Sequence, residues 1–77
     1  MKRLEVALTE SEAKILLEAL VIRERALAEV CASSTDEDAV ADAGNDLVEL
    51  RLLLNELRDS AVGQFGTGVV NFDRSSL

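Results

Sequence analysis

The acidic residues near the middle of the chain are the first candidates for chemistry, because five of them fall between Asp36 and Asp46. Carboxylates bind calcium in an EF-hand loop, which supplies oxygen ligands from its first, third and fifth positions and a glutamate at the twelfth. Counted from Asp36, the fifth position is Val40 and the twelfth is Leu47, so the spacing does not fit. Acids in the first turn of a helix also stabilise its dipole. We adopt this second interpretation and predict no metal site.

Cys31 and the glycine-rich segment 63–68 are the remaining candidates. The chain has no His and one Cys, so it lacks an ordinary general base, a partner to activate Cys31 and a zinc ligand set. Cys31 is interpreted as a small apolar core residue. A phosphate-binding glycine loop precedes a helix and usually carries a Lys, whereas segment 63–68 follows a helical pattern and contains no Lys. We therefore predict a non-enzyme with no catalytic residue and no cofactor.

Length and composition limit the class of protein. The 77 residues suffice for one domain, 1–77. Below about 70–80 residues a single core rarely provides more than roughly 3–5 kcal/mol, which favours stabilisation by partner subunits. The chain has no apolar run of the roughly 20 residues that a membrane span needs and no signal-peptide pattern at its start. With its lone cysteine, it is expected to be a cytoplasmic protein without membrane contact.

A short strand and a long helix are predicted at the start of the chain. Leu4, Val6 and Leu8 alternate with charged or small residues, which predicts a strand over about 3–8. Thr9 and Glu12 have the spacing of a capping box, and a helix over about 10–32 follows without Pro or Gly. Charged residues occupy one narrow strip of this helix, while apolar residues cover roughly two-thirds of its circumference.

A second helix is predicted over about 36–61, after a Ser-Ser-Thr-Asp break at 33–36 that is rich in capping residues. Gly44 within it is either tolerated near a weak first turn or marks a close helix crossing or bend. Segment 63–72 is a glycine-rich end with a candidate strand at 69–72, and the tail 73–77 is expected to fray. Heptad spacing defines the hairpin seam as Val40, Ala43, Leu47, Leu50, Leu54 and Leu57.

The predicted fold class is mainly α: an antiparallel two-helix hairpin with a short N-terminal strand and a candidate C-terminal one. The narrow seam of the second helix covers only part of the apolar surface of the first, so we expect two hairpins to form a homodimeric four-helix bundle. Arg23 either extends its charge to solvent or pairs with an acid of the partner, such as Glu49 or Glu56. The predicted dimer interface comprises Ile15, Leu16, Ala19, Leu20, Ile22, Arg23, Ala26, Leu27 and Val30.

The function expected from these features is a non-catalytic, homo-oligomeric protein–protein interaction module whose first partner is itself. The net charge is −7, and segment 36–59 contributes −6 of it, with eight acids and two bases. The alternative is an acidic regulator or inhibitor, of the kind phages and plasmids carry, that binds a basic or nucleic-acid-binding host protein. Its candidate partner face is Asp38, Asp42, Glu49, Glu56 and Asp59.

Residues 1–20 give a minor alternative. The start Met1-Lys2-Arg3, followed by a short strand and two helices, resembles the ribbon-helix-helix architecture. That resemblance implies a dimer that inserts a two-stranded ribbon into the major groove of DNA. The chain departs from the pattern in three ways: Glu5 at an outward strand position repels phosphate, both helices look long, and the loop lacks glycine. Contact with nucleic acid is therefore not the expected function.

Overall fold

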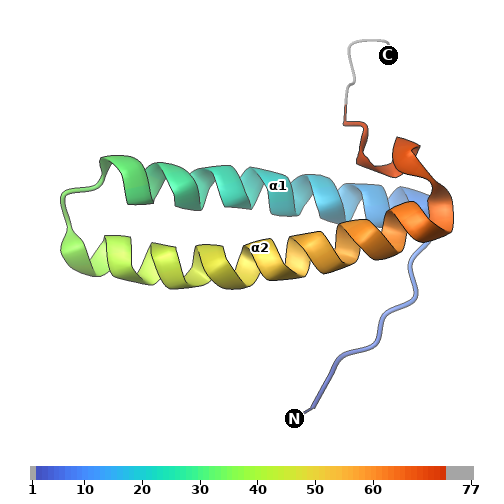
Figure 1. Cartoon of the computed structure of the whole chain (residues 1–77), viewed down its shortest axis with the longest axis horizontal. Coiled ribbons are helices and arrows are strands. Elements are labelled where there is room, and N and C mark those ends of the chain that lie inside the picture. Colours follow the sequence, from blue (N-terminus) through green and yellow to red (C-terminus); the bar gives the residue numbers. More distant parts are fainter. Residues whose placement is uncertain (1, 73–77) are drawn as a thin grey trace.

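The protein is a helical hairpin, as the sequence predicts. The computed structural model describes residues 2–72. Helix α1 spans Glu10–Ser33, helix α2 spans Glu37–Phe65, and a short 3-10 helix, η1, spans Thr67–Val70. The two long helices lie side by side and antiparallel, with η1 at the end away from the turn (Figure 1).

Helix α1 begins at the predicted capping box. The Thr9 hydroxyl accepts a hydrogen bond from the Glu12 backbone N–H at 3.2 Å, and the Thr9 backbone N–H donates to Glu12 Oε1 at 2.9 Å. The bond from the Thr9 backbone, with a smaller contribution from its hydroxyl, lowers the pKa of Glu12 below its ordinary value. Glu12 is thereby held as a carboxylate, the form that best satisfies the free N–H groups of a helix start.

The turn between the helices is capped on both sides. At the end of α1, the backbone N–H of the C-cap residue Ser34 donates to the Val30 carbonyl at 3.0 Å. Asp36 is the N-cap of α2: its Oδ1 accepts from the backbone N–H groups of Asp38 at 3.0 Å and of Ala39 at 3.4 Å. A connection this short holds the helices antiparallel.

Helix α2 continues past the predicted end near residue 61. It passes through Gly63 and ends at Phe65, and Gly66 follows with a φ of +89°. An interior glycine costs about 1 kcal/mol in a helix, but Val62 and Phe65 pack against the core, and their burial offsets that cost. Gly66, rather than Gly63, is the residue that ends the helix.

The structure has no strand at either predicted place. Residues 2–9 have no regular secondary structure. Of the candidate C-terminal strand at 69–72, residues 69–70 belong to η1 and residues 71–72 have no regular secondary structure. A strand needs a partner for its backbone hydrogen bonds, and the N-terminal segment runs away from η1 and from the C-terminal end of the described chain (Figure 1). The tail 73–77, which was expected to fray, lies outside the described residues.

The core is a single seam between the helices, and it has two parts. Near the turn, Leu27 packs with Ala43 and Leu47. Near the other end, η1 lies against the seam and buries Val69 completely. The molecule measures 40 × 40 × 14 Å along its principal axes, so the helices form one layer rather than the two layers of a typical domain. The second part of the core consists of Ala13, Leu17, Leu54, Ala61 and Val69.

Gly44 does not mark a close helix crossing, because a Cβ built at this position would have no neighbour within 4 Å. We expect Gly44→Ala to raise the free energy of unfolding by about 1 kcal/mol, since alanine is the better helix former. Urea denaturation followed by circular dichroism measures this. Gly66→Ala is the control: its positive φ disfavours a side chain, so this variant should lose stability. A destabilised Gly44→Ala protein would contradict the open environment at residue 44.

Candidate interaction surface

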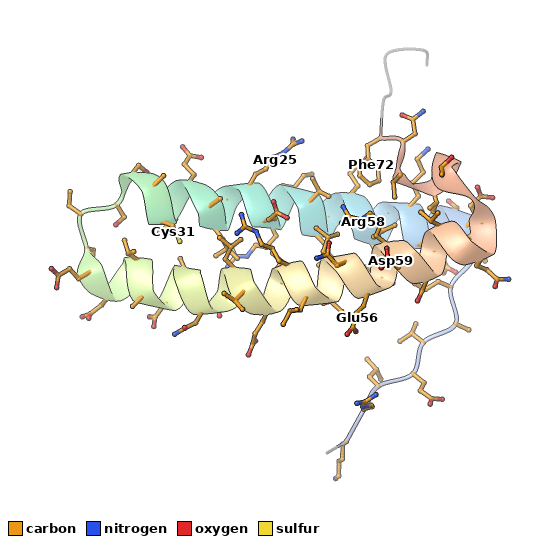
Figure 2. All side chains as sticks on the ribbon, in the orientation of Figure 1. Arg25, Cys31, Glu56, Arg58, Asp59 and Phe72 are labelled. Carbon is orange, nitrogen blue, oxygen red and sulfur yellow. The ribbon has the colours of Figure 1, made fainter. Side chains whose placement is uncertain are left out.

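The seam residues predicted from the heptad pattern all lie on the side of α2 that faces α1. Ala43, Leu47 and Leu54 are buried, and Val40, Leu50 and Leu57 are half-buried. Alternating spacings of three and four residues keep them on one face of the helix. Figure 2 shows the side chains that fill the space between the helices.

The nine residues predicted as a dimer interface fall into two neighbouring stripes of α1. Leu27 is buried, Leu20 and Val30 are half-buried, and the other six are exposed. The stripes are distinguished by rotation about the helix: one borders α2, and the other points away from it. The first stripe is Leu16, Leu20, Arg23, Leu27 and Val30, and the second is Ile15, Ala19, Ile22 and Ala26.

The two sides of the hairpin seam are covered differently. On one side, near the end away from the turn, Val70 and Phe72 lie against a cavity that Leu17, Val21 and Leu54 also line. The other side is covered near the termini by the N-terminal segment, where Val6 and Leu8 line a cavity. Between this segment and the turn, no described element covers that second side.

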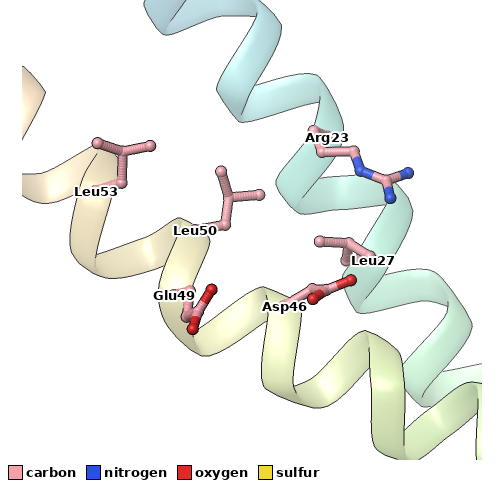
Figure 3. Close-up of a pocket in the computed structure, with 6 residues that line it drawn as sticks. All are labelled: Arg23, Leu27, Asp46, Glu49, Leu50 and Leu53. Carbon is pink, nitrogen blue, oxygen red and sulfur yellow. The ribbon is translucent and has the colours of Figure 1, made fainter. Parts of the chain in front are cut away.

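We call this uncovered side the open face. Its centre is a shallow cavity of about 440 Å³ between the helices (Figure 3). Two of its leucines are substantially exposed: Leu53 by 52 % and Leu16 by 40 %. The open face comprises the residues that line this cavity, Arg23 and Leu27 of α1 and Asp46, Glu49, Leu50 and Leu53 of α2, together with Leu16 and Leu20, which helical spacing places on the same stripe of α1.

Helix α2 is more apolar at its surface than the heptad analysis suggested. Val48 and Leu52 are both 62 % exposed, and helical spacing places them towards the edge of the hairpin away from α1. Leu53 is exposed as well, but on the open face. Sequence reasoning missed these three residues because none occupies a heptad seam position. The signal that could have found them is the run Leu52-Leu53-Leu54, which a single narrow stripe cannot contain.

Arg23 is exposed, and its side chain lies on the open face together with the carboxylates of Asp46 and Glu49 (Figure 3). Within residues 2–72, no hydrogen bond or ion pair involves the side chains of these three residues. The guanidinium of Arg23 and the two carboxylates therefore lie at the same position along the hairpin, on a face otherwise lined by leucines, without forming an ion pair within the described part of the chain.

The candidate partner face is exposed along the whole of α2. Asp38, Asp42, Glu49 and Glu56 follow one another at spacings of four, seven and seven residues, which places them in one row. Asp59 is also exposed but lies outside that row. Figure 2 shows Glu56 projecting from the outer side of α2. The row borders the open face, because Glu49 belongs to both.

The remaining candidates for chemistry lie apart from one another. Cys31 is half-buried near the turn, where it packs against the core. Among the described residues, no three His, Cys, Asp or Glu side chains are placed to hold a metal ion. Neither helix in this part of the chain has an apolar stretch suited to crossing a membrane.

Comparison with known protein families, curated proteins and solved structures finds no significant match to this chain. Its function must therefore be inferred from the geometry of the hairpin itself.

Proposed function

We propose that this protein is a non-catalytic helical interaction module that self-associates through its open face into a homodimeric four-helix bundle. The observation that carries the proposal is the exposure of Leu53 in the central cavity of the open face, which no described element covers. Leu16, which helical spacing places on the adjoining stripe of α1, is exposed as well. A second hairpin laid on this face would supply the missing second layer.

The energetics favour such an assembly. Complete burial of one leucine side chain is worth about 1.5–3 kcal/mol. A chain of this size rarely obtains more than roughly 3–5 kcal/mol from its own core. Covering the partly exposed leucines of two open faces would therefore add stabilisation comparable with that of the hairpin alone.

The dimer would leave surfaces for a further partner. The edges that carry Ile15 and Ile22 on α1 and Val48 and Leu52 on α2 lie away from the open face and would stay accessible. The acidic row would form the polar rim of the dimer interface. This row supports a narrower version of the proposal, in which the dimer acts as an acidic regulator that binds a basic or nucleic-acid-binding protein.

Light scattering behind a sizing column tests the proposal. At micromolar concentration, the protein should have twice the mass of one chain, and dilution should shift the equilibrium towards the single chain. A folded protein that keeps the mass of one chain throughout the micromolar range would overturn the proposal.

A further inference from the structure

The charges of the open face constrain how two copies can meet. Arg23 comes from α1, whereas Asp46 and Glu49 come from α2, and all three line one cavity. They therefore lie at the same level along the hairpin, with opposite charges on opposite sides of the seam. Such a face is self-complementary only in particular orientations, because a twofold dimer places the same surface on both sides of the interface.

Two twofold arrangements would bring open face against open face. If the axis runs across the helices, α1 packs on α1 of the second copy in the reverse direction. Because α1 spans Glu10–Ser33, Arg23 lies close to its midpoint, so the two Arg23 side chains would approach each other. Like charges facing each other across an interface repel and weaken association. This arrangement is therefore disfavoured.

If the axis instead runs parallel to the helices, each α1 packs on α2 of the second copy. A rotation about this axis preserves the level along the hairpin. Arg23 of each chain then faces Asp46 and Glu49 of the other, and the contact occurs twice. Arginine is suited to this role, because its planar guanidinium binds carboxylates through paired hydrogen bonds.

We infer that two copies of this chain pair with their turns at the same end, held in that orientation by Arg23 of each copy against Asp46 and Glu49 of the other. The inference rests on the proposed function and specifies its interface. The contact acts on orientation more than on affinity, since ion pairs at interfaces lose much of their attraction to desolvation. The same orientation brings both N-terminal segments to one end of the bundle.

Charge exchange tests the contact. Arg23→Glu places a third acid beside Asp46 and Glu49 of the other copy, and Asp46→Arg with Glu49→Arg surrounds Arg23 with like charges. Each variant alone should dimerise at least roughly tenfold more weakly than the unmodified protein. Mixed together, the two should form a heterodimer, because both of its contacts again join opposite charges. Sedimentation equilibrium of the separate and mixed proteins measures this.

Arg25→Glu is the control. It reverses the charge of another exposed arginine on α1 that lies outside the open face, and it should dimerise normally.

A cross-link tests the orientation independently of the charges. Thr35→Cys, combined with Cys31→Ser, places one thiol at the turn of each copy. With both turns at the same end, a short bismaleimide should join the copies. In the opposite orientation the turns would be about 36 Å apart, the length of the 24-residue α1, which such a linker cannot span.

The outcomes separate the inference from the proposed function. A dimer that tolerates Arg23→Glu, a mixture without heterodimer or a dimer whose turns do not cross-link would overturn the inference and leave the interaction module standing. An unmodified protein that stays a folded monomer would overturn both.

Discussion

Leu53→Asp is expected to convert the dimer into a folded monomer. Leu53 is 52 % exposed in the single chain, so a polar side chain there can remain hydrated while the hairpin folds. In the dimer it would lie under the second hairpin, where an unpaired carboxylate is costly. It would also stand near Asp46 and Glu49, which line the same cavity. Light scattering should give the mass of one chain, with a helical circular dichroism spectrum like that of the unmodified protein.

Leu52→Asp is the matched control. It makes the same substitution in the adjacent residue of the same helix, where the side chain is 62 % exposed. Consecutive helical residues are rotated by about 100°, so Leu52 points to the edge of the hairpin rather than across the open face. This variant should remain a dimer. If both variants became monomeric, the dimer would use the edge as well as the open face, and if neither did, the open face would not be the interface.

The parts of the fold that the sequence predicts well are those set by neighbouring residues. The capping box of Thr9 and Glu12 and the cap of α2 at Asp36 need only the residues within one turn, and both form. The two helices follow from long periodic patterns without proline. The mainly helical hairpin is therefore confirmed, because its determinants are local.

The end of the hairpin away from the turn was harder to predict because it depends on packing. Gly63 and Gly66 are alike as isolated helix terminators, but Val62 and Phe65 contact the core, which carries α2 past the first glycine to the second. The candidate strand at 69–72 has the composition of a strand. Complete burial of Val69 against the seam accompanies a 3-10 turn instead. The sequence around residue 69 does not reveal this contact, because the residues that bury Val69 are distant in the chain.

The sequence predicts which residues are apolar in the candidate surface but not the side of the hairpin on which each of them lies. Helical periodicity shows that α1 is apolar around most of its circumference. It does not show which part of the helix surface packs against α2, which part belongs to the open face and which part forms the outer edge of the hairpin. The positions of α2, η1 and the N-terminal segment decide that. Ile15 and Leu16 therefore belonged to one predicted interface, although the first lies on the edge and the second on the open face.

Leu54→Asp is expected to unfold the protein altogether. Leu54 is 4 % exposed and packs with Leu17 and Ala61 beneath Val69. Truncating such a leucine to alanine costs about 2–5 kcal/mol, and a buried carboxylate adds a desolvation penalty. The sum exceeds the roughly 3–5 kcal/mol that a core of this size provides on its own, so the chain should be unfolded at concentrations too low for dimer formation to stabilise it. Circular dichroism at 25 °C should show a largely unfolded chain.

Leu53→Asp serves as the control that shows whether unfolding of Leu54→Asp arises from the core position of residue 54. Leu53 and Leu54 are adjacent, and the two variants have the same composition and the same net charge. A general effect of added charge on helix α2 would therefore affect both alike. Loss of helix in Leu54→Asp alone would locate the stability of the chain in the seam between α1 and α2. An equally helical Leu54→Asp protein would contradict the burial of this side chain. The three successive leucines thus separate the three surfaces of α2: Leu52 its edge, Leu53 its open face and Leu54 its core, and each surface has a different readout.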